Sequence, residues 1–435
     1  MKGTVNFSRS AAVGILLLLG SSVLVEAQAV VRIPVQRGAG GAPVPCAQDA
    51  VCHNRIHPAI KPGAFAEPGD LVVFETRDAA DNQLNFGSTT ADFASFDPNR
   101  VHPLTGPLYV NGAEAGDLLE VTIVRVDPGP DQFAWTATFP GFGFLRDLFP
   151  APFLARWRLN QGLGTSPDVP GVKIPSNGFP GVITTAPGPD LLGTILDREL
   201  ALLLKGGAVL PPEPASAIPT DVCGLGGDHP GECLRTLPPR EHGGNFDSKW
   251  MARGARVLLP CFVPGCLLSL GDVHFAQGAG ESNGTAMEMN AVVTVRVNLR
   301  KGQAALFGNR ATFEGGQQFR QLAPTEFFAT IGLPLKGEGD LIPQHLGPGI
   351  LGDLAYFDPS ELAPLTNLSE DLTLAVRDAL NQMIDYLVNV RGLTRDQAYV
   401  LCSVAVDLHI SNVVDIPNFA VHAVLPLEVF GRRDP

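Results

Sequence analysis

The sequence is poor in charged residues and has no basic cluster. Charged side chains make up 17% of the 435 residues, and the formal net charge is −13. Nucleic acids and anionic membranes bind to surfaces rich in Lys and Arg, so we expect neither as a partner. The sequence also lacks a P-loop, a dinucleotide fingerprint and an H-E-x-x-H motif. It therefore gives no support to nucleotide use or to the common zinc-protease chemistry.

Long apolar runs are absent after the N-terminus, where residues 1–29 have the order of a signal peptide. Lys2 and Arg9 precede the run AAVGILLLLGSSVLV, and the small residues of VEAQA follow it. This order of basic, apolar and small residues marks a segment that is cleaved on export. We expect cleavage after Ala27 or Ala29 and a secreted or periplasmic mature protein with no membrane attachment. An uncleaved membrane anchor is the alternative.

Cysteines are few, and no two of them have the C-x₂-C spacing of a structural zinc site. Six of the seven form three close pairs: Cys46 and Cys52, Cys223 and Cys233, and Cys261 and Cys266. In an oxidising compartment we expect the first two pairs to form local disulfides. The third pair flanks FVPG, and Cys402 lies in an apolar helical pattern.

Glycine and proline are abundant, with 48 and 38 copies, which favours turns and strands over long helices. Strand patterns occupy about 47–127 and 241–300 and are clearest in NAVVTVRVNL, where valine alternates with polar residues. Residues 128–240 between them are predicted to be loop-rich, with one helix in LLGTILDRELALLLKG. Residues 67–76 and 114–124 each place a Gly-Asp turn before a β-rich run. This predicts two hairpins, although such turns are also common by themselves.

The C-terminal part, about 367–412, changes to a helical period. Six apolar residues recur at helical spacing: Leu372, Val376, Leu380, Met383, Ile384 and Leu387. Gly392 is the predicted stop, Asn367 with Glu370 the predicted N-terminal cap, and Thr394 with Gln397 a capping box for a second helix. We therefore predict an α+β protein of one domain over 30–435, a β-rich, jelly-roll-like sandwich with added C-terminal helices.

The run SLGDVHFAQGAGE concentrates polar side chains in a chain with only nine histidines. Asp272 and His274 are two residues apart, so they lie on the same side of an extended strand. Gln277 and Glu281 follow, and EHGGNFD, HNRIHP, ETRDAADNQ and VHPLTGP add further polar groups. Oxygen ligands with one or two imidazoles suit calcium, magnesium or zinc. A hydrogen-bonded loop, in which the acids accept backbone N–H groups, is the alternative.

GESNG matches the G-x-S-x-G pattern of serine hydrolases letter for letter. That pattern requires a strand before the nucleophile, here Ser282, and a helix after it. A β-branched strand pattern follows instead. The sequence therefore does not favour a serine nucleophile.

Longer stretches resemble the acetamidase/formamidase family. The central one, HGGNFDSKWMARGARVLLPCFVPGCLLSLGDVHFAQGAGESNGTAME, is similar to the family's HGGN-x-D, LP-x-x-VPGAL and GD-x-HAAQG-x-GE-x-x-GTA-x-E signature. HNRIHPAIKPGAFAEPGD, ETRDAADNQ and RVHPLTGPLYVNGAEAGDLLEV resemble its N-terminal part. PGFGFLRDLFPAPF and FPGVITTAP resemble its middle, and DYLVNVRGLTRDQAYVLCSVAVDLHISNVVDIPN its C-terminal part. The resemblance covers most of the mature chain.

The resemblance implies a hydrolase that cleaves the C–N bond of small linear amides to ammonia and a carboxylate. It also implies a β sandwich with added helices, a homo-oligomer, and a divalent metal ion in the active site, with zinc or calcium expected. Such an ion polarises the amide carbonyl and lowers the pKa of a bound water.

Carried over to this sequence, the motifs assign provisional roles to eight residues. The expected metal ligands are Asp272 and His274, with Asp78 and His102 as weaker candidates. The expected general acid/base is Glu281, with Asp247 as ligand or base, and Asn245 and Gln277 are expected to bind the amide substrate.

The sequence departs from the family pattern near the motif. Ala279 replaces the acid of QGDGE, Phe275 replaces an alanine, and Cys266 stands where VPGAL has alanine. Loss of an acid would weaken a metal site. An exported relative that binds a metal or small ligand without turnover is therefore the alternative function.

Overall fold

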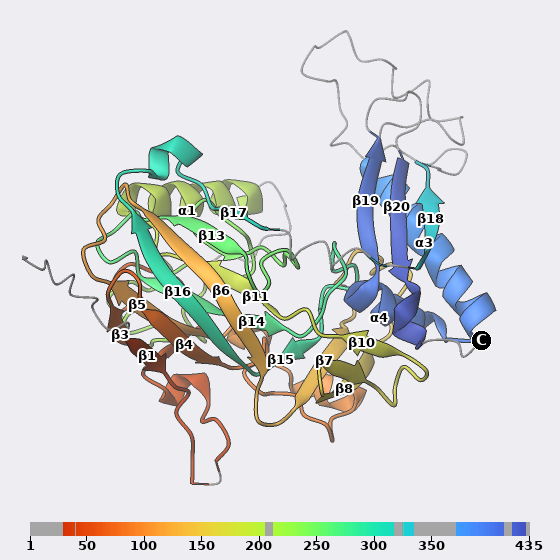
Figure 1. Ribbon diagram of the computed structural model, residues 1–435. Coiled ribbons are helices and arrows are strands. Elements are labelled where there is room, and N and C mark those ends of the chain that lie inside the picture. The colour runs from red at the N-terminus through yellow and green to blue at the C-terminus, as the bar shows by residue number, and fades with distance from the viewer. Residues whose placement is uncertain are drawn as a thin grey trace, which may run out of the picture.

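The computed structural model describes residues 29–39, 41–204, 212–316, 324, 326–334, 371–412 and 420–431. The predicted signal peptide and the predicted Asn367–Glu370 cap lie outside these residues, apart from Ala29. The described chain is mostly β structure with a few helices, which confirms the α+β class (Figure 1).

The first sheet has six strands with the long strand β16 near its middle. Its strands, in spatial order, are β1 (Val30–Ile33), β4 (Leu71–Thr76), β16 (Ala291–Arg300), β6 (Leu118–Pro128), β13 (Arg256–Pro260) and β17 (Thr312–Glu314). Only β1 and β4 pair in parallel. The valine alternation of β16 places Val293 opposite Phe74 on one side and Val126 on the other.

The two Gly-Asp segments do not form hairpins, because the strands before the turns, β3 (Ala64–Ala66) and β5 (Leu104–Val110), belong to the second sheet, whereas β4 and β6 belong to the first. Their turns are nevertheless alike. The N–H of Glu67 donates to Asp70 Oδ2 at 2.9 Å, and the N–H of Glu114 donates to Asp117 Oδ2 at 2.8 Å. The repeated sequence thus specifies a repeated turn, whereas strand pairing is decided by segments far away in the chain.

The second sheet has eleven strands. Its main path is β10 (Lys173–Pro175), β9 (Leu163–Thr165), β8 (Phe153–Asn160), β7 (Phe133–Thr138), β15 (Glu288–Met289), β14 (Leu268–His274), β11 (Phe179–Thr184) and β12 (Gly243–Asn245). The remaining strands are β5 (Leu104–Val110), which also pairs with β14, and its neighbours β2 (Cys52–His53) and β3 (Ala64–Ala66). The strand β14 is therefore enclosed by β15, β11 and β5.

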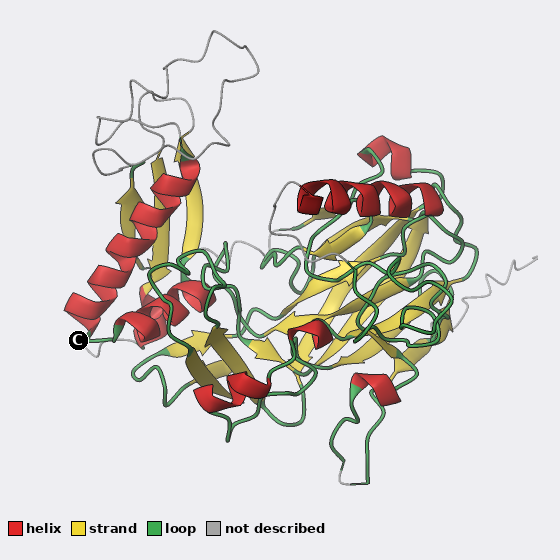
Figure 2. Cartoon of the chain, turned by 180° about the vertical axis from the view of Figure 1, so that it is seen from behind, coloured by secondary structure: helices red, strands yellow, loops and turns green. Residues whose placement is uncertain are grey.

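The two sheets share one hydrophobic core, as a sandwich requires. Alternate residues such as Phe74 of β4 and Val295 of β16 meet Leu268 and Leu270 of β14. The opposite face of the second sheet is covered by α1 (Pro189–Leu204), whose Leu192 and Ile195 pack on Leu104 and Val182 (Figure 2).

The segment 128–240 contains more regular structure than its sequence predicts. The helix α1 was expected, but β7 to β11 also lie here. Proline and glycine weaken the strand pattern in the sequence of these segments. An example is β11, which has the sequence FPGVIT and in which every residue is buried. Burial between neighbouring strands outweighs the low strand preference of Pro180 and Gly181.

The C-terminal unit packs two helices against a third sheet. The sheet has the order β18 (Phe327–Gly332), β20 (Ala420–Pro426) and β19 (Asp407–Asn412), and the helices are α3 (Leu372–Arg391) and α4 (Arg395–Ala405). Figure 2 shows α3 lying along this sheet. Asp371 caps α3 through its Oδ1, Gly392 ends it, and the capping box of Thr394 and Gln397 at α4 is confirmed.

Three disulfides cross-link the described chain. Both predicted pairs, Cys46–Cys52 and Cys223–Cys233, are present, together with Cys261–Cys266. Cys402 is buried in α4 and is the free cysteine. Among the residues that the structure describes, no helix combines the length and apolar character needed to cross a bilayer.

Candidate active site

The strand β14 brings Asp272 and His274 to one place, as the sequence predicts. All seven of its residues are buried, and both polar side chains are at most 2% exposed. His274 Nε2 lies 3.5 Å from Asp272 Oδ1. Two polar groups this deeply buried require partners, because an unpaired buried charge is costly.

Gln277 fixes the orientation of the His274 ring. The amide Nε2 of Gln277 donates to the backbone oxygen of Asp247 at 2.6 Å, so Oε1 of the same amide is left as an acceptor. His274 Nδ1 lies 2.8 Å from this Oε1 and therefore carries the proton. Nε2 is then the nitrogen that faces the cluster, and it has no hydrogen-bond partner within the described part of the chain. Burial alone would lower the pKa of His274, but the charges of Glu288 and Asp272 outweigh it and raise this pKa well above its usual value, so a bound cation would take the place of the proton on Nε2.

Three further carboxylates surround the His274 ring. Glu288 of β15 is opposite His274 in the sheet, and its Oε2 lies 3.2 Å from Nε2. Asp247, which follows β12, places Oδ1 at 3.9 Å from Nε2. One atom each from His274, Glu281 and Glu288 lies within 4.8 Å of the others, as do atoms of Asp247, Asp272 and His274. These are two overlapping groups of potential metal ligands.

The electrostatics of the cluster favour a bound cation. Burial, reinforced by Asp272, raises the pKa of Asp247 to about 6, and burial raises the pKa of Glu288 to about 7. Burial and the charge of Asp247 raise the pKa of Glu281 well above its usual range. Burial alone would also raise the pKa of Asp272, but the two neighbouring imidazoles outweigh it and lower this pKa to about 2. The carboxyl groups therefore compete for ionisation, and a divalent cation would remove that competition.

Two unpaired oxygens point to the same conclusion. Oδ1 of Asp247 and Oε2 of Glu288 are buried and accept no hydrogen bond from any residue the structure describes. Together with Nε2 of His274 they form a mixed oxygen and nitrogen donor set. This set fits a divalent ion such as zinc.

Gly181 of β11 makes room for the carboxylates. A Cβ atom at this position would lie 2.6 Å from Asp247 Oδ1 and 2.6 Å from Asp272 Oδ2. Only a residue without a side chain leaves this space to the two oxygens. Gly181 was not predicted to belong to the site, although the stretch FPGVITTAP contains it.

His102 lies at the edge of the cluster, where its Nε2 is 3.8 Å from Asp272 Oδ1. Burial lowers the pKa of His102 below its usual value, and the nearby His274 adds to this effect. Thr236 Oγ1 accepts the backbone N–H of His102 at 2.8 Å and lies 3.2 Å from its Nδ1. Thr236, which lies in the segment 212–242, thus supports His102, which lies in the N-terminal half of the chain.

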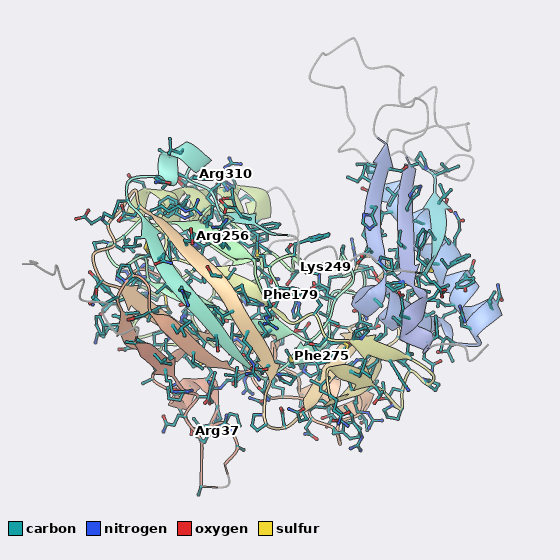
Figure 3. The ribbon with its side chains drawn as sticks, in the orientation of Figure 1. Arg37, Phe179, Lys249, Arg256, Phe275 and Arg310 are labelled. Atoms are coloured by element: carbon teal, nitrogen blue, oxygen red, sulfur yellow. A yellow bond between two sulfur atoms is a disulfide. The ribbon has the colours of Figure 1, made fainter. Side chains whose placement is uncertain are left out.

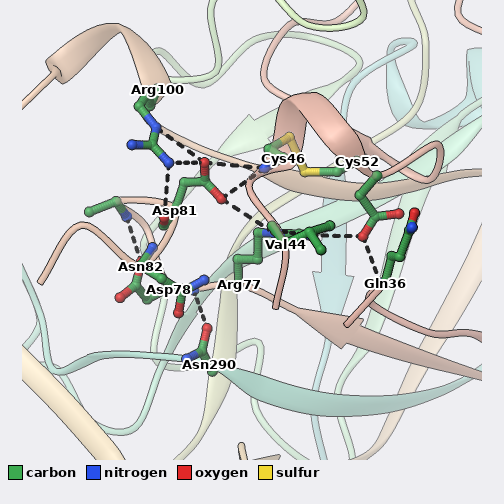
Figure 4. Close-up of polar contacts among 12 residues, drawn as sticks. Gln36, Val44, Cys46, Cys52, Arg77, Asp78, Asp81, Asn82, Arg100 and Asn290 are labelled. Carbon is green, nitrogen blue, oxygen red and sulfur yellow. Dashed lines mark hydrogen bonds and ion pairs between the residues drawn. A yellow bond between two sulfur atoms is a disulfide. The ribbon is translucent and has the colours of Figure 1, made fainter. Parts of the chain in front are cut away.

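The structure does not bring Asp78 into this cluster of ligands. Its Oδ1 accepts the N–H groups of Ala80 and Asn82 at 3.0 and 2.8 Å, and its Oδ2 accepts Trp135 Nε1 at 3.1 Å. Figure 4 shows Asp78 in a network with Asn82 and Asn290. Both oxygens are therefore used to hold the loop, the alternative that the sequence left open for its acids.

Asn245 and Gln277, the two predicted substrate ligands, differ in their surroundings. Oδ1 of Asn245 is buried and has no hydrogen-bond partner among the described residues, so it is available to a substrate N–H. Gln277 uses its Oε1 on His274 and its Nε2 on Asp247. The structure places Gln277 behind the histidine.

Glu288 is the cluster residue that the sequence analysis missed. It stands in the quoted stretch GTAME, where an acid interrupts an apolar run. An acid in a strand that is otherwise buried needs a partner, and this was the available signal. Its partner His274 became apparent only through the pairing of β15 with β14.

The C-terminal unit holds the loop that follows β14. Lys249 Nζ donates to the Asp407 carboxylate at 2.6 Å, and the N–H of Ala279 donates to the same Oδ1 at 2.9 Å. The N–H of Leu408 donates to the oxygen of Ala279 at 2.9 Å. Figure 3 places Lys249 in the central region between the sandwich and this unit. The loop with Glu281 is thus fixed from two sides.

Comparison with known proteins gives matches over most of the chain. The Acetamidase/Formamidase family matches residues 43–348 and 360–432. An acetamidase of Mycolicibacterium smegmatis is 34% identical over 372 residues, which cover 80% of this chain and 84% of that protein. A formamidase of Methylophilus methylotrophus is 32% identical over 400 residues, which cover 89% and 91%. A gamma lactamase from Delftia acidovorans has a similar solved structure, with a TM-score of 0.79, 30% identity, and coverage of 93% and 94%.

Proposed function

The chain belongs to the acetamidase/formamidase family, and we propose that it hydrolyses a small amide with a divalent metal ion held by Asp247, Asp272 and His274. The reaction cleaves the amide C–N bond and yields a carboxylate and ammonia. One observation carries the metal site: Nε2 of His274, which has no hydrogen-bond partner among the described residues, faces Oδ1 of Asp247 and Oε2 of Glu288, which have none either. Asp247, Asp272 and His274 are the three metal ligands that we propose.

Distances within the cluster agree with shared coordination. Ligand atoms at about 2.05 Å from a tetrahedral zinc ion are roughly 3.3 Å apart. The separations from His274 Nε2 are 3.5 Å to Asp272 and 3.9 Å to Asp247, with 3.2 Å to Glu288 as a further donor. One imidazole among carboxylates favours zinc over calcium, whose ligands are oxygens.

Each residue has a defined task in the proposed reaction. Asp247, Asp272 and His274 would hold a divalent ion, which would polarise the amide carbonyl and make water a better nucleophile. Asn245 Oδ1 accepts an N–H of the substrate amide and so orients it. Glu281, which lies in the same group as His274, would take a proton from the water that attacks the carbonyl carbon and give it to the amine as the C–N bond breaks. Gln277 keeps Nε2 of His274 turned toward the cluster.

The test is ammonia release by the mature protein from formamide, acetamide and larger linear amides, before and after chelation of metal. We expect release that is lost on chelation and restored by zinc. Asp272→Asn and His274→Ala should each lose the metal ion of this cluster and remain folded. Asp385→Asn removes an exposed carboxylate that pairs with Arg395 and is the matched control. Unchanged metal content in both cluster variants would refute the ligand assignment.

A cyclic amide is the second candidate substrate, and the structural similarity to the gamma lactamase favours it. Hydrolysis of a γ-lactam opens the ring and keeps the nitrogen in the product, so it releases no ammonia. A primary-amine assay on the same samples distinguishes this substrate from a linear amide. No turnover of either class by the folded, zinc-loaded protein would favour the alternative of a binding protein.

We also propose that the mature chain is exported to an oxidising compartment and assembles as a homo-oligomer. The three disulfides support the first part, because reducing cytosol does not maintain such bonds. N-terminal sequencing of the secreted or periplasmic fraction tests cleavage after Ala27 or Ala29. Light scattering of the same material tests the oligomer.

A further inference from the structure

A second group of potential metal ligands shares no residue with the candidate active site. It consists of His57, His229 and Glu232, each of which places one donor atom within 4.8 Å of the others. The rings of His57 and His229 have centroids 4.2 Å apart and an interplanar angle of 34°. His57 comes from the N-terminal half, and the other two residues come from the segment 212–242. The group therefore joins two distant parts of the chain.

Both contributing segments are fixed by covalent or backbone bonds. His57 follows Ile56, whose N–H and oxygen both bond to Leu234 at 2.9 Å. His229 and Glu232 lie within the loop that the Cys223–Cys233 disulfide closes. The N–H of His229 donates to the oxygen of Val222 at 2.8 Å. Because the three side chains are held close before any ion binds, little ordering cost opposes binding.

The short contact between His229 and Glu232 shows which of their atoms would meet at an ion. His229 Nδ1 lies 3.0 Å from Glu232 Oε2, close to the roughly 3.3 Å between two ligand atoms of a tetrahedral zinc ion. An ion held by both atoms would take the place of the proton that they share. His57 Nδ1 accepts the N–H of Ala59 at 3.1 Å, so coordination through this nitrogen replaces a backbone hydrogen bond.

The group is also accessible to an ion from solution. The side chain of His229 is 35% exposed and that of Glu232 is 55% exposed, whereas His57 forms the buried floor at 5%. Two imidazoles and a carboxylate are a zinc ligand set, with a fourth position left for water. Magnesium and calcium prefer oxygen donors alone.

We propose that His57, His229 and Glu232 form a second, non-catalytic binding site for a divalent transition-metal ion of the zinc type. An ion at this site ties the disulfide loop 223–233 to the segment around His57. Since binding to the folded state stabilises it by mass action, zinc should raise the melting temperature through this site.

The experiment is a zinc titration of the metal-stripped mature protein with its disulfides intact. We expect the unaltered protein to bind one zinc equivalent more than His229→Ala, with equal amidase activity in both. Glu232→Gln should weaken binding of this equivalent by at least about 10-fold, because an uncharged amide replaces a carboxylate ligand. His409→Ala removes an imidazole that is 52% exposed outside the group and is the matched control, which should retain every equivalent.

Two results would overturn the proposal. One is an unchanged number and affinity of zinc ions in both His229→Ala and Glu232→Gln. The other is a protein whose entire zinc content disappears with Asp272→Asn, because all the zinc would then belong to the active site. Should His229→Ala not fold, Glu232→Gln alone decides, since that side chain is exposed and its replacement keeps the shape. The extra equivalent can be present even if no amide is hydrolysed, so this result is separate from that of the proposed function.

Discussion

Replacing Gly181 with alanine tests whether the neighbouring carboxylates of Asp247 and Asp272 bind the same metal ion. The new methyl group would lie 2.6 Å from Asp247 Oδ1 and from Asp272 Oδ2, whereas ordinary contact begins at 3.4 Å. Each oxygen would therefore have to move by about 0.8 Å. Metal coordination distances tolerate about 0.2 Å. The displacement is four times this tolerance, so we expect the substitution to disrupt the metal site.

Gly181→Ala should keep the overall fold, because Gly181 does not have the positive φ that excludes other residues. The new Cβ would also lie 2.9 Å from the backbone oxygen of Asp272, so we expect a local shift of β14. We expect zinc affinity to fall by at least 100-fold, and ammonia release to fall with it. The readouts are zinc affinity, measured by competition with a chromophoric chelator, and turnover of acetamide at saturating zinc. Circular dichroism and the melting temperature report on the fold.

The matched control is Gly193→Ala in α1, where a Cβ atom meets nothing within 4 Å. This substitution should stabilise the helix by about 0.5–1 kcal/mol and leave zinc affinity unchanged. A Gly181→Ala protein that binds zinc as tightly as the unaltered protein would refute the reasoning. The two oxygens would then not share an ion.

Three further substitutions test separate parts of the site. Ser282→Ala should leave turnover unchanged, because Ser282 Oγ has no hydrogen-bond partner in the described structure and so no base to activate it. A folded variant whose turnover falls by several orders of magnitude would point to a serine nucleophile. Gln277→Met should weaken zinc binding about 10- to 100-fold, since His274 loses its Nδ1 acceptor; unchanged affinity in the chelator assay would contradict this role. Lys249→Met should lower the free energy of unfolding, measured in urea, by about 3–5 kcal/mol, because Asp407 loses its buried partner. A change below about 1 kcal/mol would contradict this role of the ion pair.

Local patterns predicted local structure well. The apolar period of α3 gave the buried residues Leu380, Met383, Ile384 and Leu387, and Gly392 ends the helix as expected. The alternation of β16 was also correct. Strand pairing could not be predicted in the same way, since the partners of β16 come from segments more than 150 residues earlier. The strand β11 was not predicted, because proline and glycine indicate a turn, whereas the segment is a buried strand.

In the candidate site, too, local features could be predicted from the sequence and contacts between distant segments could not. Spacing alone placed Asp272 and His274 together, because two residues on one strand need no knowledge of the fold. The positions of Asp247, Glu281 and Glu288 depend on how β12, β15 and a loop meet β14, and only the structure supplies that. Asp78 shows the limit of resemblance, since a quoted motif identified the residue but not its role in holding a loop.

The departures from the family pattern can now be judged by where they lie. Ala279 replaces an acid, but its backbone is held by Asp407 and Leu408, and the cluster has its carboxylates from Asp247, Asp272 and two glutamates. Phe275 directly follows the last residue of β14, is 1% exposed and belongs to the hydrophobic core, and its N–H donates to the oxygen of Met287. Neither departure removes a donor from the cluster. The reason for doubting catalysis therefore weakens, and the amidase is favoured over a binding protein.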